Sequence, residues 1–227
     1  MVGHSQATSP VARPSGGSPE FLLPRLVASA TMVSLDSESD VLKRGDNAPS
    51  FELAGADGQM YRLEGFADNE ALLVVFTCNH CPYAKAKIPE LNRLAEEYDD
   101  LAVVGINSND PKEYPDDSFE RMQEVVAEGT VGYDAYLHDA DQSVAAAYGA
   151  RCTPDPFLFD NDAGDFRLAY HGRLDDAPNP DDEPSEREMA DHVETLLAGE
   201  EVTAAEKPSR GCSIKWMPGN EPDYWEL

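Results

Sequence analysis

The most informative segment of the chain reads Ala71-Leu72-Leu73-Val74-Val75-Phe76-Thr77-Cys78-Asn79-His80-Cys81-Pro82-Tyr83. Residues 71–77 are almost entirely apolar, which predicts a central strand covered on both faces. Beyond the cysteines, Ile88, Leu91 and Leu94 recur at helical spacing and predict a helix that Pro89 would kink. A Cys-x-x-Cys pair is therefore expected where a buried strand ends and a helix begins.

Alternating strand and helix signals surround this segment. Residues 51–53 and 61–63 flank the turn Asp57-Gly58 and predict an N-terminal β-hairpin. Further strands are expected at residues 101–106, 136–138, 157–159 and 167–170, and further helices at 117–128, 142–148 and 185–198. Strands that alternate with helices and end in a hairpin predict an α/β fold, a three-layer sandwich with a mixed central sheet flanked by helices.

The two ends of the chain differ from its centre. Residues 1–42 are expected to be a disordered N-terminal arm, because the first part is rich in Ser, Pro and Gly without a period. Met32 opens the acidic part and is a candidate for the true start. Residues 43–198 form the expected domain. The tail, residues 199–227, has no period but contains both tryptophans, so it is expected to pack on the domain.

Charge is the strongest compositional feature. The 227 residues contain 17 Lys and Arg against 44 Asp and Glu, a net charge of −27. Such a surface repels phosphate backbones and anionic lipids, so neither nucleic acid nor a membrane is expected as a partner. The same excess of carboxylates is typical of proteins adapted to molar salt, where self-repulsion is screened. We therefore expect a halophilic protein that loses structure as KCl falls below molar concentration.

A signal peptide is not expected. Ala28-Ser29-Ala30 resembles a cleavage site, but Pro24 and Arg25 interrupt the stretch where an apolar region is required. The sequence therefore favours a cytoplasmic location, where four cysteines indicate redox or metal chemistry rather than a disulfide scaffold.

The Cys-x-x-Cys pair carries the predicted chemistry. A helix N-terminus offers unpaired N–H groups and partial positive charge, which favour a thiolate. Cys78 is therefore expected to be the nucleophile, with a depressed pKa, and Cys81 the resolving thiol. His80 lies between them, where an imidazolium would stabilise the thiolate further. No cofactor and no bound metal are expected in this interpretation.

A second segment, Thr153-Pro154, is the candidate substrate site. If the bond before Pro154 is cis, the backbone there exposes an edge where an extended disulfide substrate can bind beside Cys78. An ordinary turn is the alternative. Tyr83 is expected to line the same face. Cys152 and Cys212 are auxiliary redox candidates, either as a second redox pair or simply as buried apolar side chains.

These motifs together resemble the thioredoxin-like superfamily, and within it the Cys-x-x-Cys subgroup of redoxins labelled alkyl hydroperoxide reductase/thiol-specific antioxidant, of a haloarchaeal type. The resemblance rests on the opening at residues 45–53, the active-site segment at 76–83, the Thr-Pro loop at 153–155 and the tail at 208–216. It implies a thioredoxin-like fold, a cis proline at 154, a Cys78–Cys81 disulfide couple and an antioxidant role.

The chain departs from two relatives within that superfamily. Peroxiredoxins have a Pro-x-x-x-Thr/Ser-x-x-Cys motif, whereas this chain has Ala71 and Val75 at the Pro and Thr/Ser positions. Thioredoxins have a buried acid six residues before the first cysteine, where this chain has Leu72. The sequence alone does not name a replacement for that acid.

The leading interpretation is a thiol–disulfide oxidoreductase that acts on protein or small-molecule disulfides and thiols with an unidentified reductant. Cys78 attacks the substrate disulfide, and Cys81 releases the mixed disulfide. One alternative is a thiol peroxidase in which Cys78 becomes a sulfenic acid and Cys81 resolves it. The other is a metal- or copper-binding protein that uses Cys78, Cys81 and His80 with His138 or His171.

Overall fold

The computed structural model of the chain describes residues 1–3 and 34–225. Most of the predicted disordered arm, the sequence around Ala28-Ser29-Ala30 and the candidate start at Met32 lie outside the described residues. Among the described helices, none is both long enough and apolar enough to cross a bilayer.

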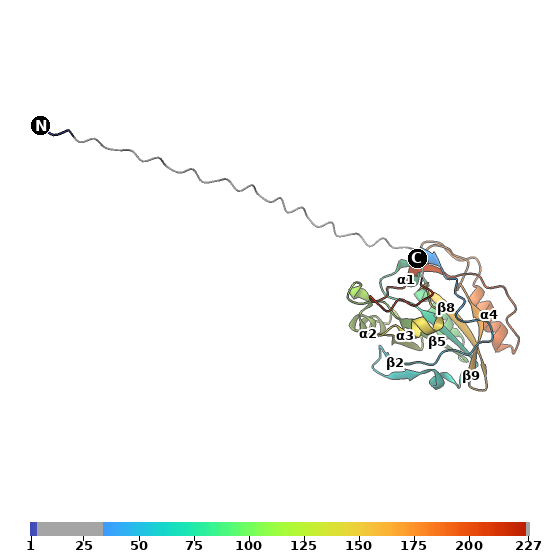
Figure 1. The fold of residues 1–227 in the computed structure, drawn as a ribbon. Helices are drawn as coiled ribbons and strands as arrows, with labels where there is room; N and C mark the ends of the chain where they lie inside the picture. The colour runs from blue at the N-terminus through green and yellow to red at the C-terminus, as the bar shows by residue number, and fades with distance from the viewer. Residues whose placement is uncertain (4–33, 226–227) are drawn as a thin grey trace. The chain divides into compact units, whose positions relative to one another are not determined.

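A seven-stranded mixed sheet forms the centre of residues 34–225 (Figure 1), in the order β3-β2-β6-β5-β4-β8-β9. Its strands are β2 (Glu52–Gly55), β3 (Met60–Arg62), β4 (Ala71–Phe76), β5 (Leu101–Asn107), β6 (Ala135–His138), β8 (Asp155–Asp162) and β9 (Asp165–His171). Strands β4, β5 and β6 are parallel, whereas the hairpins β2–β3 and β8–β9 form the two antiparallel edges. The predicted mixed sheet with an N-terminal hairpin is confirmed.

Helices cover both faces of this sheet. They are α1 (Pro82–Glu97), α2 (Phe119–Ala127), α3 (Ser143–Tyr148) and α4 (Glu188–Leu197), with the short 3-10 helices η1 (Leu63–Phe66) and η2 (Pro115–Asp117). Apolar residues of α1, α2 and α4 pack in one core cluster, and those of α3 and η1 pack in another. The three-layer arrangement is confirmed, and α1 continues as one helix through Pro89.

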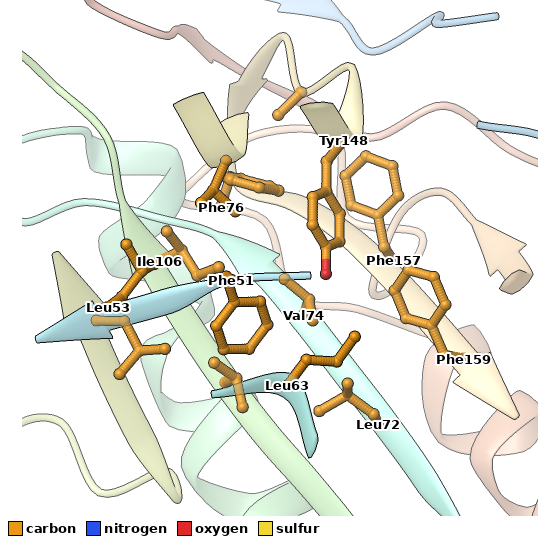
Figure 2. Packing of buried hydrophobic residues seen from close by; sticks show 14 of the residues in the cluster. Phe51, Leu53, Leu63, Leu72, Val74, Phe76, Ile106, Tyr148, Phe157 and Phe159 are labelled. Carbon is orange, nitrogen blue, oxygen red and sulfur yellow. The ribbon is translucent and has the colours of Figure 1, made fainter. Parts of the chain in front are cut away.

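Strand β4 contributes to both core clusters because successive side chains on a strand point to opposite faces. Leu73 and Val75 pack with the α1, α2 and α4 cluster, whereas Leu72, Val74 and Phe76 pack with the other. Figure 2 shows this second cluster, in which aromatic rings from β4, α3 and β8 lie together. Strand β4 is buried along its whole length, and the Cys-x-x-Cys loop begins directly after it.

A second, three-stranded sheet was not predicted. It has the order β1-β10-β7, formed by β1 (Ser34–Asp36), β10 (Arg210–Ser213) and β7 (Cys152–Thr153). Strand β1 lies within the segment expected to be disordered, and it is ordered here because β10 offers it a backbone edge. The C-terminal tail thus joins the N-terminal segment to the loop that carries Pro154.

Candidate active site

The Cys-x-x-Cys loop lies at the carboxyl end of the parallel strands. Cys78 follows the end of β4, and Cys81 is the N-cap residue of α1, with Pro82 in the first turn. Pro is favoured there because its fixed φ suits a helix start and its missing N–H is not needed. The carboxyl ends of neighbouring parallel strands meet at one edge, where α/β proteins place their functional groups.

The end of β7, next to the Thr-Pro bond, contacts both cysteines. The Thr153–Pro154 peptide bond is cis. The Cys78 Sγ lies 3.3 Å from Thr153 Oγ1, and the Cys81 thiol donates to the Thr153 carbonyl at 3.3 Å. The structure therefore brings together the predicted thiols and the predicted Thr-Pro loop, and Tyr83 packs against the cysteines from α1.

A buried carboxylate, that of Asp117, organises the other side of the loop. The side chain is fully buried, and its Oδ1 accepts the backbone N–H groups of Asn79 at 2.7 Å and His80 at 3.1 Å. Its Oδ2 accepts from the Asn109 side chain at 2.8 Å and hydrogen-bonds to His80 Nδ1. A single acid from η2 thereby holds the two residues between the cysteines.

His80 is placed by contacts on both of its sides. Its ring stacks on Tyr114 with a centroid separation of 4.4 Å, and its Nδ1 is paired with Asp117. Its Nε2 is buried and has no hydrogen-bond partner among the described residues. A ring nitrogen of His80, a carboxylate oxygen of Asp117 and the Cys78 Sγ all lie within 4.8 Å of one another. His80 therefore lies near Cys78, and its ring is held there by an acid that the sequence did not identify.

The depressed pKa predicted for Cys78 is wrong for this arrangement. Burial raises the pKa of the Cys78 thiol well above its usual range, and the neighbouring Cys81 and the charge of Asp117 raise it further. The exposed fraction of Cys78 is 1%. The prediction failed because the Cys78 thiol is buried, not exposed at the helix terminus, and lies beside Cys81 and the carboxylate of Asp117.

The helix terminus acts on Cys81 instead. Hydrogen bonds from the Cys212 and Cys78 thiols, and from the backbone N–H groups of Ala84 and Cys212, lower the pKa of Cys81 despite its burial. Three thiols at van der Waals contact can share at most one negative charge at moderate cost. That charge is best stabilised on Cys81, the N-cap residue at the positive end of α1.

Cys212 joins this thiol cluster from the tail. It is 1% exposed and packs with Cys78, Cys81 and Ala84. In the β10–β7 ladder, Cys212 lies opposite Thr153, and Ser213 lies opposite Cys152.

Cys152 is separated from Cys212 by the register of the same ladder. Residues directly opposite each other share a face, so the side chains of Cys152 and Cys212 point to opposite faces. The Cys152 thiol donates to the Pro154 carbonyl at 3.3 Å. A direct Cys152–Cys212 bridge, one of the sequence-based hypotheses, would require these strands to rearrange.

All four cysteines are free thiols in the structure. The other two histidines proposed as metal ligands lie in separate contacts: His138 stacks on Phe119 at 5.3 Å, and His171 is hydrogen-bonded to Asp155 at 2.8 Å. Asp117 is the site residue that the sequence analysis missed, since residue 117 was expected only as the first residue of a helix. The available signal was the absence of an acid at Leu72, which implied that a buried carboxylate would come from another loop.

Comparisons with known proteins identify the family and the fold of the chain. Residues 44–164 match the AhpC/TSA family. A hypothetical protein from Sinorhizobium meliloti 1021 has 41% sequence identity and a TM-score of 0.73, over 81% of this chain and 99% of that one. An uncharacterized conserved protein from Geobacillus kaustophilus has 42% identity and a TM-score of 0.74, over 83% and 98%.

A more distant structure is a putative thiol:disulfide interchange protein DsbE from Chlorobium tepidum, with 18% identity and a TM-score of 0.50 over 70% of this chain and 97% of that one. At that identity the likeness concerns the fold alone, which is thioredoxin-like. No curated protein matches the chain.

Proposed function

Because this chain belongs to the AhpC/TSA family, we propose that it is a thiol–disulfide oxidoreductase that uses Cys78 and Cys81 as its redox couple. The observation that carries the proposal is the contact of both thiols with one residue, Thr153, on the loop that holds the cis proline. Two thiols that pack against each other are what an intramolecular disulfide couple requires.

The proposed reaction has two exchange steps. Cys78 attacks a substrate disulfide, forms a mixed disulfide and releases the first substrate thiol. Cys81 then attacks the Cys78 sulfur, which releases the second substrate thiol and leaves a Cys78–Cys81 disulfide. The lowered pKa of Cys81 suits this second step, because the attacking species must be a thiolate.

The first step needs a proton acceptor, since the raised pKa keeps Cys78 protonated in this arrangement. His80 is the candidate acceptor, because its buried Nε2 has no partner among the described residues and its Nδ1 is anchored by Asp117. In this proposal His80 takes the proton of Cys78 as the thiol attacks, and Asp117 is a positioning residue that orients the ring.

Trapping tests the proposal. In Cys81→Ser the mixed disulfide cannot be resolved, so a substrate disulfide should stay covalently attached to Cys78 and be released by dithiothreitol. The matched control is Cys78→Ser/Cys81→Ser, which should trap nothing. Equal capture by the two variants would rule out Cys78 as the attacking thiol. The captured molecules would identify the disulfide partners and the direction of electron flow.

The peroxidase alternative is weaker on the same geometry. A peroxide-reducing cysteine must be a thiolate, and the charge of Asp117 and burial both act against a thiolate at Cys78. The sequence also lacks the peroxiredoxin motif, with Val75 in the Thr/Ser position. Peroxide consumption at rates comparable to disulfide reduction would favour this alternative.

One observation favours a second candidate function, metal binding. The ligand atoms of Cys78, His80 and Asp117 lie close enough to hold one ion. Soft thiolate with imidazole suits copper or zinc. Metal analysis of protein purified without oxygen tests this candidate: a stoichiometric ion lost in Cys78→Ser but kept in Cys152→Ala would support it.

Adaptation to high salt and a cytoplasmic location are two further parts of the proposal. The net charge of −27 supports adaptation to molar salt. A circular-dichroism signal that stays unchanged from molar KCl to dilute buffer would contradict this adaptation to salt. A cytoplasmic location, where a dithiol reductant would recycle the Cys78–Cys81 disulfide, also stays a prediction.

A further inference from the structure

Strand β10 occupies the backbone edge beside Thr153-Pro154, where the sequence analysis expected an extended substrate to bind. It pairs antiparallel with β7, beside the cis-proline loop, with Cys212 opposite Thr153. An extended peptide that adds to a sheet edge makes this same kind of pairing. The chain's own tail therefore presents a cysteine beside the redox couple in the manner of a bound substrate.

The tail is fitted closely to that edge. A Cβ at Gly211 would lie 2.1 Å from the Thr153 carbonyl oxygen, so only a residue without a side chain allows this approach. Ser209 Oγ donates to the Pro154 carbonyl at 2.7 Å on the other side of the loop. Both contacts hold Cys212 where its buried thiol meets that of Cys81.

The residues after Cys212 are fastened to the domain as well. The Lys215 N–H donates to Asn109 Oδ1 at 2.8 Å, and its carbonyl accepts from the Asp110 N–H at 2.8 Å and from the Gln142 side chain at 2.9 Å. Contacts on both sides of Cys212 make its place in the thiol cluster a property of the fold rather than of a loose chain end.

We infer that Cys212 is a third redox-active cysteine, which exchanges disulfides with Cys81. The inference rests on the proposed function, because that function supplies the Cys78–Cys81 disulfide. The Cys212 thiol loses its proton as its sulfur attacks the Cys81 sulfur, the Cys81–Cys212 bond forms and the Cys78–Cys81 bond breaks. Cys78 leaves as a thiolate and takes up the proton that Cys212 released, so the protein gains and loses no electrons in this step.

The exchange moves the oxidised bond from the motif to the tail strand. Cys78 becomes a free thiol again, while the chain still stores one disulfide. A dithiol reductant then attacks the Cys81–Cys212 bond and returns both cysteines to thiols. The tail is thus an internal substrate of the redox couple, and Cys152, on the opposite face of its strand, takes no part.

Disulfide mapping in Cys78→Ser tests the inference. Oxidation by diamide, followed by alkylation and peptide mass spectrometry, should yield an intramolecular Cys81–Cys212 disulfide, with Cys152 alkylated. The matched control, Cys78→Ser/Cys152→Ala, should give the same bond. Recovery of Cys81 and Cys212 as separate alkylated thiols in a folded variant would overturn the inference.

Wild-type protein provides a second measurement that does not depend on the variant's folding. After limiting diamide, some oxidised molecules should carry alkylated Cys78 together with a Cys81–Cys212 bond. Alkylation of Cys212 in every oxidised molecule would overturn the inference. A Cys78–Cys81 disulfide in oxidised Cys212→Ser shows that the proposed function stands by itself, whereas its absence there would count against the proposed function.

Discussion

Cys78 and Cys81 belong to one motif, yet their surroundings favour opposite protonation states. Cys78 lies beside the buried carboxylate of Asp117, and its pKa is raised. Cys81 caps α1 and accepts hydrogen bonds from the tail, and its pKa is lowered. Burial and the neighbouring Cys81 are the main causes of the raised pKa of Cys78, to which Asp117 of η2 adds, whereas hydrogen bonds from Cys212 of β10 and from Cys78 lower the pKa of Cys81.

The contrast shows that a Cys-x-x-Cys spacing does not decide which thiol is ionised. The partial positive charge of the helix terminus lowers the pKa of the cap residue, Cys81. At Cys78, three residues earlier, burial near a carboxylate raises the pKa instead. Two segments distant in sequence, around Asp117 and Cys212, add to the difference that burial of Cys78 and its contact with Cys81 create. Changes in either segment should therefore alter one thiol and leave the other largely as it was.

Removal of a thiol is expected to have the largest effect. Cys78→Ser should lower turnover in an insulin-reduction assay by about 10³-fold or more, because no other group can attack the substrate disulfide. Cys81→Ser should also lose turnover but accumulate mixed disulfides on Cys78, which non-reducing electrophoresis detects. Cys152→Ala is the control and should keep turnover. Wild-type turnover in Cys78→Ser would show that the two thiols have been assigned the wrong roles.

Displacement of the tail should come next in size. In Gly211→Ala the new Cβ would meet the Thr153 carbonyl at 2.1 Å, so β10 must move away from β7. We expect a loss of about 1–3 kcal/mol in the free energy of unfolding. The pKa of Cys81 should rise, because the hydrogen bonds from Cys212 are weakened, while that of Cys78 changes less.

Urea denaturation and the pH dependence of iodoacetamide labelling at each cysteine check both parts of this prediction. Gly65→Ala is the matched control, because a Cβ at Gly65 meets no atom within 4 Å. An unchanged Cys81 labelling profile in Gly211→Ala would mean that the tail does not stabilise the Cys81 thiolate.

Changes at Asp117 should act on the other thiol. Asp117→Asn removes a charge that adds to the effect of burial and of Cys81 on the pKa of Cys78, so Cys78 should be labelled faster at neutral pH. The variant should also lose about 1–3 kcal/mol of stability, because one acceptor of a buried hydrogen-bond network becomes a donor. His80→Ala should shift Cys78 the opposite way, since Asp117 then loses its ring partner. Equal rates of Cys78 labelling in the two variants would show that Asp117 and His80 do not influence the pKa of Cys78.

Much of the fold could be predicted from the sequence. The apolar run at residues 71–77 and the helical spacing after it located β4 and α1, and the Asp57-Gly58 turn located the β2–β3 hairpin. These elements have strong local signals, because a strand buried on both faces must be apolar throughout. The small sheet β1-β10-β7 had no such signal, since its strands are two to four residues long and rest on pairing between distant segments.

The candidate site was predictable in its members but not in its electrostatics. Cys78, Cys81 and the Thr153-Pro154 loop are recognisable from spacing and context. Asp117 is not, because its role depends on η2 folding back over the Cys-x-x-Cys loop, and nothing near residue 117 in sequence indicates that contact. The pairing of Cys212 with the Pro154 loop has the same cause, a ladder between segments about sixty residues apart.

The smallest effect is expected at Asp155 and His171, which lie next to the Thr153-Pro154 segment that both cysteines contact. Asp155 follows Pro154 and is fully buried, and it accepts from Ser37 Oγ at 2.7 Å and from the Arg151 N–H at 2.9 Å. His171 lies 2.8 Å from its other oxygen. Burial alone would lower the pKa of His171, but the charge of Asp155 and the hydrogen bond to it outweigh burial and raise that pKa.

The sign of the pH effect follows from this shift. Because the folded state binds the His171 proton more tightly than the unfolded state, the extra stability is fully present below the ordinary histidine pKa of ~6.5. It is lost as the pH rises through the higher folded pKa. The difference in the free energy of unfolding between wild type and His171→Asn, measured in urea at constant KCl, should therefore shrink over that range.

His192→Asn is the control with the opposite sign, because burial lowers the pKa of His192 and its proton is released on folding. The His171–Asp155 pair lies next to the Thr153-Pro154 segment, and both cysteines contact Thr153. His171→Asn should therefore change the labelling of Cys78 and Cys81 together. A change in the labelling of only one cysteine would contradict the idea that the His171–Asp155 pair supports both. A difference in the free energy of unfolding that does not vary with pH would show that the titration of His171 does not contribute to stability.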